Sequence, residues 1–172
     1  SCSGDGTTLG KPVPGTDRAM SGFNNWWAYY TAHIKFYRAF SAFDTDARAM
    51  PVDSFMKKYG TGKYTVLKYV AADTIVQYKL QELPANADEN ISNMLPALAY
   101  ADYQNFRRMG KPLTGFDYTD LDGRIFNALT MKGKIVVLKF WFIGCQPCIE
   151  EMPELNRIVG LNRRRQDVVF IS

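Results

Sequence analysis

Helical periodicity marks three segments in the first part of the chain. Apolar side chains recur at helical spacing over 23–34 and again over 88–109. A shorter helix is predicted over 51–59, because a proline stands at its start and a glycine follows its end. Pro96 lies inside the longest of these segments, and it predicts a kink or a division into two helices.

Alternation of apolar and polar side chains marks three strands in the same part of the chain. The predicted strands cover 34–42, 63–70 and 74–83, and the short segment 71–73 favours a hairpin between the last two. A hydrophobic content of 47% is enough for a packed core. Residues 21–110 are therefore predicted to form a small α+β domain with an antiparallel sheet of about three strands.

A different pattern follows a linker that begins at Lys111. The apolar run over 135–142 predicts a buried strand, which ends at Gly144. Apolar side chains then recur at helical spacing, at Ile149, Met152, Leu155, Ile158 and Val159. The segment Cys145-Gln-Pro-Cys148 lies between this strand and the start of this helix. Pro147 stiffens the loop and suits the first positions of a helix.

Two cysteines at this spacing, on the first turn of a helix, can close a small disulfide ring. The free N–H groups and the positive dipole end of the helix favour a thiolate at Cys145. A thiolate is the attacking species in thiol–disulfide exchange. We expect Cys145 to be the more exposed of the two, and Cys148, one turn into the helix, to be shielded.

Several residues of this stretch fit one known pattern, F-W-x-x-x-C-x-P-C-x-x-E-x-P: Phe140, Trp141, Cys145, Pro147, Cys148, Glu151 and Pro153. The chain thereby resembles thioredoxin-like proteins of the TlpA/ResA group. Residues 116–127, with a turn at Asp122-Gly123, resemble the N-terminal hairpin of that group. The resemblance covers 111–172 and implies an α/β thioredoxin-like fold with thiol–disulfide oxidoreductase activity.

The resemblance also assigns roles to single residues. Glu151 is expected to relay a proton to Cys148, and Trp141 is expected to pack under the site. Lys139 stands where thioredoxins carry a buried aspartate, and Gly144 stands where the family usually has tryptophan. Two interpretations of Lys139 are open: it shares a proton with Glu151 and tunes the cysteines, or it extends from a strand end to the surface.

The thioredoxin fold continues beyond its active-site helix and the next strand. Here a strand over 168–172 comes last, so the sequence predicts only the N-terminal half of that fold. A half-fold leaves a sheet edge and apolar surface unpaired. We therefore expect the natural protein to continue past Ser172.

The first residues suggest a location. Cys2 lies among small polar residues and is followed by a stretch rich in glycine, threonine and proline, which resembles the start of a bacterial lipoprotein. Lipidation at Cys2 would anchor the protein in the cell envelope or periplasm, and residues 1–20 would be a flexible tether. The alternatives are that Cys2 is a free thiol or pairs with another molecule.

The expected partners follow from the family and from the charge. The resemblance implies protein disulfides as substrates, a membrane thiol carrier as electron donor, and no metal or organic cofactor. The net charge of +4 is small, and no basic stripe is interleaved with exposed aromatic residues, so nucleic acid is not an expected partner. No apolar run is long enough to span a membrane.

Three other functions are open. A thiol peroxidase of the related kind needs Thr or Ser three residues before the first cysteine, where this chain has Phe142. A metal-carrying thioredoxin-like protein needs a histidine near its thiolates. The only histidine here, His33, is expected to be a packed residue, so this alternative places the ligand beyond Ser172. A non-enzymatic binding protein would use the aromatic N-terminal domain and keep the disulfide as a structural bond, which its redox potential would reveal.

Overall fold

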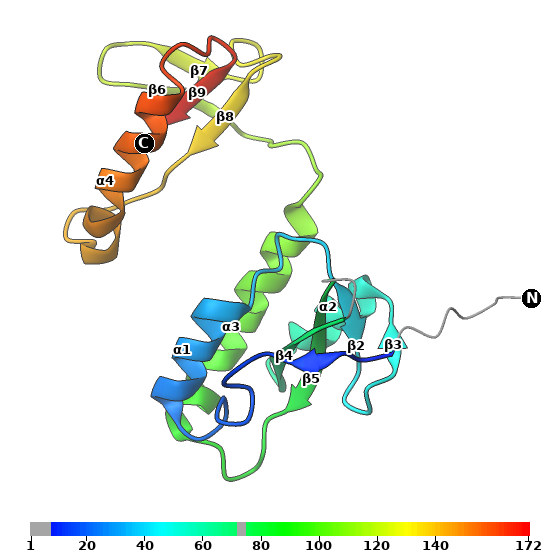
Figure 1. The fold of residues 1–172 in the computed structure, drawn as a ribbon. Helices are drawn as coiled ribbons and strands as arrows, with labels where there is room; N and C mark the ends of the chain where they lie inside the picture. Colours follow the sequence, from blue (N-terminus) through cyan, green and yellow to red (C-terminus); the bar gives the residue numbers. More distant parts are fainter. Residues whose placement is uncertain (1–7, 72–74) are drawn as a thin grey trace, which may run out of the picture. The chain divides into compact units, whose positions relative to one another are not determined.

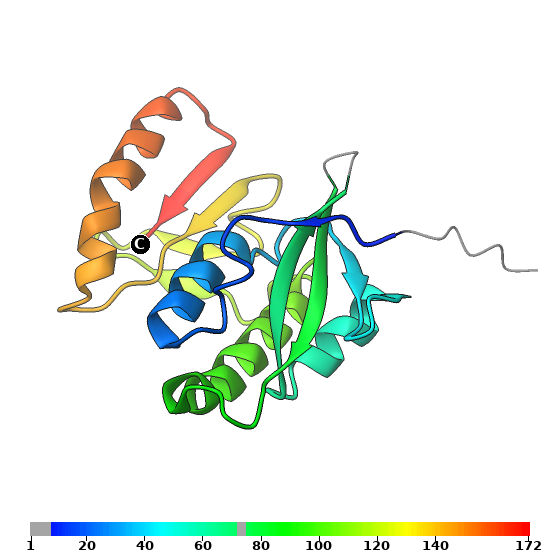
Figure 2. The same cartoon turned by 60° about the horizontal axis from the view of Figure 1, so that its bottom comes forward.

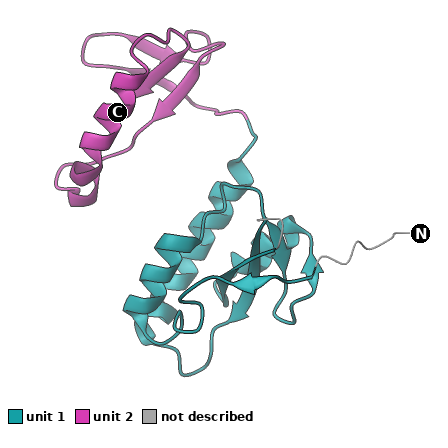
Figure 3. Cartoon of the chain, in the orientation of Figure 1, with its two compact units in different colours: residues 1–111 teal, residues 112–172 magenta. Residues whose placement is uncertain are grey.

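The chain divides into two compact units. The computed structural model describes residues 8–71 and 75–172, so Cys2 and most of the predicted turn at 71–73 lie outside the described residues. Unit 1 extends from Ser1 to Lys111 and unit 2 from Pro112 to Ser172 (Figure 3).

Unit 1 contains a five-stranded sheet with the strand order β1-β4-β5-β2-β3 (Figure 1). The strands are β1 (Lys11–Pro12), β2 (Ser41–Phe43), β3 (Ala49–Met50), β4 (Tyr64–Val70) and β5 (Val76–Glu82). β2 runs parallel to β5, and every other neighbouring pair is antiparallel. The prediction of an antiparallel sheet is therefore right for the β4–β5 hairpin and wrong for the sheet as a whole, which is mixed.

The described residues of unit 1 also form three helices: α1 (Phe23–His33), α2 (Val52–Tyr59) and α3 (Glu89–Arg108). α1 and α3 lie side by side on one face of the sheet in both views (Figures 1 and 2). Their buried side chains repeat every three to four residues, as the periodicity predicts, at Trp26, Tyr29, Tyr30, Ile91, Leu95 and Ala99. α3 passes through Pro96 as one helix, so the predicted division into two helices does not occur.

One predicted strand of unit 1 is mostly absent. Only residues 41 and 42 of the predicted strand 34–42 belong to β2, and the residues before them form no strand, with a turn at 36–37. The backbone N–H of Lys35 donates to the hydroxyl of Tyr78 instead of to a neighbouring strand. The ring of Phe36 packs 5.2 Å from that of Tyr59. Long-range contacts with aromatic side chains thus replace the alternating strand that the local pattern indicates.

The predicted tether is too long. Residues 8–20 belong to unit 1: β1 pairs with β4, and Ala19 is only 1% exposed. The buried side chain of Gln77 holds the segment from both sides, since it accepts from the N–H of Gly10 at 2.6 Å and donates to the carbonyl of Thr8 at 3.1 Å. A Cβ at Gly10 would lie 2.2 Å from the carbonyl oxygen of Val70, so this approach requires glycine.

Unit 2 contains a hairpin and a strand–helix–strand segment. The hairpin pairs β6 (Asp117–Thr119) with β7 (Ile125–Asn127), and Gly123 in its turn has a φ of 79°, which confirms the predicted turn. α4 (Gln146–Leu161) connects β8 (Ile135–Leu138) to the parallel strand β9 (Val168–Ile171). Within the described residues, no helix is both long enough and apolar enough to cross a membrane.

The strand predicted over 135–142 is shorter and less buried than expected. It ends at Leu138, and the large apolar side chains of 140–143 are exposed. Among the described strands, β8 pairs only with β9, and a sheet of two strands packed with a single helix buries little of the apolar surface of its strands. Unit 2 thus combines strands and a helix, as the thioredoxin-like prediction requires, but its apolar strand is only partly covered.

Candidate redox site

The two cysteines of unit 2 form a disulfide at the start of α4. Cys145 and Cys148 are bonded, with their Cα atoms 5.3 Å apart. Cys145 is the N-cap of the helix, and Pro147 occupies one of its first two positions. Gly144 has a φ of 87°, so it makes the turn that leads from the apolar segment 140–143 into the helix. The local sequence therefore places a small disulfide ring at a helix N-terminus, as predicted.

The exposure of the two cysteines is opposite to the prediction. Cys145 is 8% exposed and is the only buried residue within 112–172, whereas Cys148 is partly exposed. The chain folds tightly around Cys145, because its N–H donates to the carbonyl of Phe142 at 3.1 Å and its own carbonyl accepts from Ile149 at 3.1 Å. The prediction that Cys145 is the more exposed thiol is therefore wrong for this disulfide-bonded state.

The helix terminus supplies a favourable field for a thiolate. The first N–H groups of a helix have no carbonyl partner within it, and here Pro147 carries no N–H at all. The N–H groups of Gln146 and Cys148 are thus the donors of the first turn. A negative charge on the sulfur of Cys145, which forms when the disulfide is reduced, would lie at the positive end of the helix dipole.

Lys139 and Glu151 form an ion pair in the same unit. Lys139 directly follows β8, and its ammonium group contacts Oε2 of Glu151, which lies one turn beyond Cys148 on α4. The Lys139 side chain is 23% exposed and that of Glu151 is 62% exposed. The structure thus brings together the two residues that the sequence singled out. A shared proton, and a relay from Glu151 to Cys148, stay predictions.

Trp141 does not pack under the disulfide. Trp141 is 51% exposed, because β8 ends three residues earlier and residues 140–143 form no strand. Pro153, the last residue of the motif, lies inside α4 and is exposed, and the helix continues past it to Leu161. The sequence thus did not predict that the segment just before the disulfide, 140–143, is apolar and exposed. An uninterrupted apolar run is typical of a buried strand and contains nothing that indicates exposure.

Comparisons with known proteins agree with the chemistry of this site. Part of the chain is similar to proteins named thiol-disulfide oxidoreductase ResA. The protein from Bacillus anthracis is 37% identical over 68 residues, 36% of this chain and 39% of that protein. The protein from Halalkalibacterium halodurans is 36% identical over 82 residues, 44% and 46% of the two chains. The protein from Geobacillus thermodenitrificans is 33% identical over 78 residues, 42% and 45%.

The site indicates a class of chemistry, and the relatives indicate a family. A disulfide between two cysteines at a helix N-terminus is the arrangement that thiol–disulfide exchange sites use. The relatives confirm the resemblance to the ResA/TlpA-type thiol-disulfide oxidoreductases, and they support a thioredoxin-like fold for the similar part. The chain spans less than half the length of the curated relatives it matches. No family model matches the chain, and no solved structure gives a significant match.

Proposed function

We propose that the chain belongs to a thiol–disulfide oxidoreductase that exchanges electrons with protein disulfides through Cys145 and Cys148. The observation that carries the proposal is the disulfide itself, which joins the N-cap of α4 to a residue of its first turn. Such a bond places both sulfurs at the positive end of a helix, where a thiolate is stabilised after reduction. The similarity to proteins named thiol-disulfide oxidoreductase supports this chemistry.

The reaction runs in two steps. In the reduced protein, the Cys145 thiolate attacks one sulfur of a substrate disulfide, which forms a mixed disulfide and releases the other substrate sulfur as a thiolate. The Cys148 thiolate then attacks the sulfur of Cys145 and releases the second substrate thiolate. Two electrons pass to the substrate, the Cys145–Cys148 bond closes, and the released thiolates take up protons.

Lys139 and Glu151 are the proposed charged groups around this exchange. Glu151 lies at i+3 from Cys148, so both side chains lie on the same side of α4. In the proposed mechanism, Glu151 accepts the proton of the Cys148 thiol as that thiol becomes a nucleophile. The ammonium of Lys139 stabilises the negative charge of this pair of groups. No metal or organic cofactor takes part in these steps.

The proposed setting is the cell envelope or periplasm. It is supported by the resemblance of the first residues to a lipoprotein start, with lipidation at Cys2. In this setting the substrates are disulfides of envelope proteins, and a membrane thiol carrier returns electrons to the Cys145–Cys148 pair. Exposed disulfides in this compartment need a dedicated source of electrons.

A trapping experiment tests the order of the two cysteines. In a Cys2→Ser background, Cys148→Ser should accumulate a mixed disulfide with an oxidised model peptide, seen by mass spectrometry, because the resolving thiol is absent. Cys145→Ser is the matched control and should trap much less. Equal trapping by both variants, or trapping by Cys145→Ser alone, would refute the proposed order.

A redox titration tests the activity class. The protein is equilibrated with glutathione buffers and its free thiols are alkylated. Mass spectrometry then gives the fraction in which the Cys145–Cys148 pair is reduced. A midpoint of roughly −120 to −270 mV is the expected result for an exchange protein. A midpoint well below about −300 mV would identify a structural disulfide and favour the non-enzymatic binding protein instead.

A further inference from the structure

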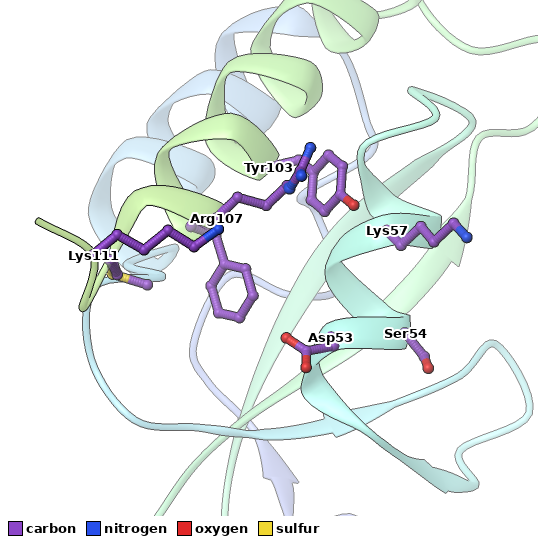
Figure 4. Close-up of a pocket in the computed structure, with 8 residues that line it drawn as sticks. Asp53, Ser54, Lys57, Tyr103, Arg107 and Lys111 are labelled. Atoms are coloured by element: carbon purple, nitrogen blue, oxygen red, sulfur yellow. The ribbon is translucent and has the colours of Figure 1, made fainter. Parts of the chain in front are cut away.

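A groove in unit 1 lies between α2 and the C-terminal end of α3 (Figure 4). Its volume is about 580 Å³. α2 contributes Asp53 and Lys57 to its lining, and the end of α3 contributes Tyr103 and Arg107, with Lys111 just beyond. Every residue that lines it belongs to unit 1, so the groove does not depend on unit 2.

The walls of the groove are held in place by the core. α2 is anchored by three fully buried side chains, Phe55, Met56 and Tyr59. Its end contacts α3 directly, since a Cβ at Gly60 would lie 2.8 Å from the Cβ of Tyr103. Both helices are thus fixed without a ligand, and the groove is preformed, which lowers the entropic cost of binding.

Phe106 and Met109 extend the groove into a second hollow of about 330 Å³. The two residues line both hollows, and the second adds Tyr37 and Arg38. Phe106 packs partly against the core, whereas Met109 is exposed and can adapt its shape to a partner. The result is an elongated apolar strip that is open to solvent, a shape that suits an extended segment better than an enclosed small molecule.

The charges along the strip are mostly positive. Four cations line the two hollows, Arg38, Lys57, Arg107 and Lys111, against the single carboxylate of Asp53. Across the residues that the structure describes, none of these five side chains forms an ion pair. The positive charge is therefore not neutralised within unit 1.

Two of the cations are pre-positioned by tyrosine rings. The guanidinium of Arg107 lies 5.7 Å from the ring centre of Tyr103, and that of Arg38 lies 5.6 Å from the ring centre of Tyr37. A guanidinium stacked in this way keeps the N–H groups of its edge free to bind a carboxylate in a bidentate manner. Arginine and tyrosine are also among the residue types that are enriched at protein interfaces.

We propose that this strip binds an extended acidic peptide segment of a partner protein. Apolar side chains of the segment would rest on Phe106 and Met109, and its carboxylates would meet Arg38, Arg107 and Lys111. Figure 4 shows the Asp53 carboxylate directed into the groove from the α2 side. It repels acidic side chains there and so confines them to the α3 side. The proposal is independent of the redox chemistry of unit 2.

The test uses the whole chain and a panel of short, end-blocked peptides in which Glu or Asp alternates with Phe, Tyr or Leu. Binding is measured by isothermal titration calorimetry at low salt. We expect saturable binding that weakens as the ionic strength rises from about 0.05 to about 0.5 M. The matched peptides with Gln or Asn in place of the acids should bind much more weakly.

Charge variants then locate the site. Arg107→Glu and Arg38→Glu should each weaken binding roughly tenfold, and Asp53→Asn should strengthen it. Lys63→Glu, at an exposed position outside both hollows, is the control for net charge and should change affinity little. Circular dichroism verifies that each variant is folded. The proposal is overturned if no acidic peptide of the panel binds below about 1 mM, if the neutral peptides bind equally well, or if Lys63→Glu weakens binding as much as Arg107→Glu.

Discussion

The three helices of unit 1 meet at one carboxylate, that of Asp102 on α3. The hydroxyl of Tyr30 from α1 donates to its Oδ2, and so does the hydroxyl of Tyr59 from α2, at 2.9 Å. Tyr59 is fully buried, and the two hydroxyl oxygens are 3.5 Å apart. Burial raises the pKa of Asp102, and the two hydroxyls oppose that shift because they stabilise the charged form. The cluster should therefore be a strongly coupled part of the fold.

The size of this coupling follows from the contacts. Tyr59→Phe removes one hydrogen bond to a carboxylate, which should cost about 1.5–3 kcal/mol of unfolding free energy. Asp102→Ala leaves two buried hydroxyls without an acceptor, and since they can bond to each other, one stays unsatisfied. The expected cost is about 2–4 kcal/mol. Once Asp102 is gone, Tyr59→Phe only removes an unsatisfied hydroxyl, so its cost should fall close to zero, which gives a coupling energy of about 2 kcal/mol.

Urea denaturation of the four proteins in this double-mutant cycle measures the coupling. Tryptophan fluorescence is read in a Trp141→Phe background, so that Trp26 and Trp27 of α1 report on unit 1. Tyr37→Phe is the control, because Tyr37 is 67% exposed and should change stability little. If Tyr59→Phe costs as much in the Asp102→Ala background as in the parent protein, the reasoning is wrong.

Two further predictions concern single charged groups. Lys139→Ala should raise the pKa of the cysteine thiols in the reduced protein, since it leaves the Glu151 carboxylate unopposed, and Glu151→Gln should have the opposite effect. Thiolate absorbance against pH measures this, and an unchanged pKa in Lys139→Ala would contradict a tuning role. At the start of α3, N–H groups of Phe23 and Asn90 donate to Asp88 and lower its pKa. Its stabilising effect is therefore present above its unfolded-state pKa and is lost as the pH falls through the lower folded-state pKa. Asp88→Asn should make the urea midpoint less sensitive to acid between about pH 5 and pH 2, and an unchanged slope would refute this.

Several elements could be predicted because their signals are local. Pro51 and the glycine after Tyr59 bracket α2, and Asp122-Gly123 sets the turn of the β6–β7 hairpin. The disulfide between Cys145 and Cys148 needs only a loop followed by a helix start, which the apolar run and Pro147 specify. In each case neighbouring residues carry the preference, so the pattern is sufficient without knowledge of the tertiary structure.

Other features were decided by contacts between distant residues. The parallel pairing of β2 with β5 and the short strand β1 depend on where the chain returns, which periodicity does not encode. The hydroxyl of Tyr78 accepts a hydrogen bond from the N–H of Lys35, 43 residues away in the chain. This N–H is therefore not paired with a neighbouring strand, as the prediction over 34–42 required. The five charged positions of the strip are spread over 38–111 and become one surface only when α2, the end of α3 and the segment 36–40 come together.

The redox site shows the same division at close range. The sequence by itself determined the two cysteines, their spacing and their position at the start of a helix. The tertiary structure decided that Cys145 is the buried member of the pair, that Trp141 is exposed, and that Lys139 contacts Glu151. The physical reason is that bonding between adjacent residues fixes a turn and a helix cap, whereas burial and ion pairing depend on which other elements cover a side chain.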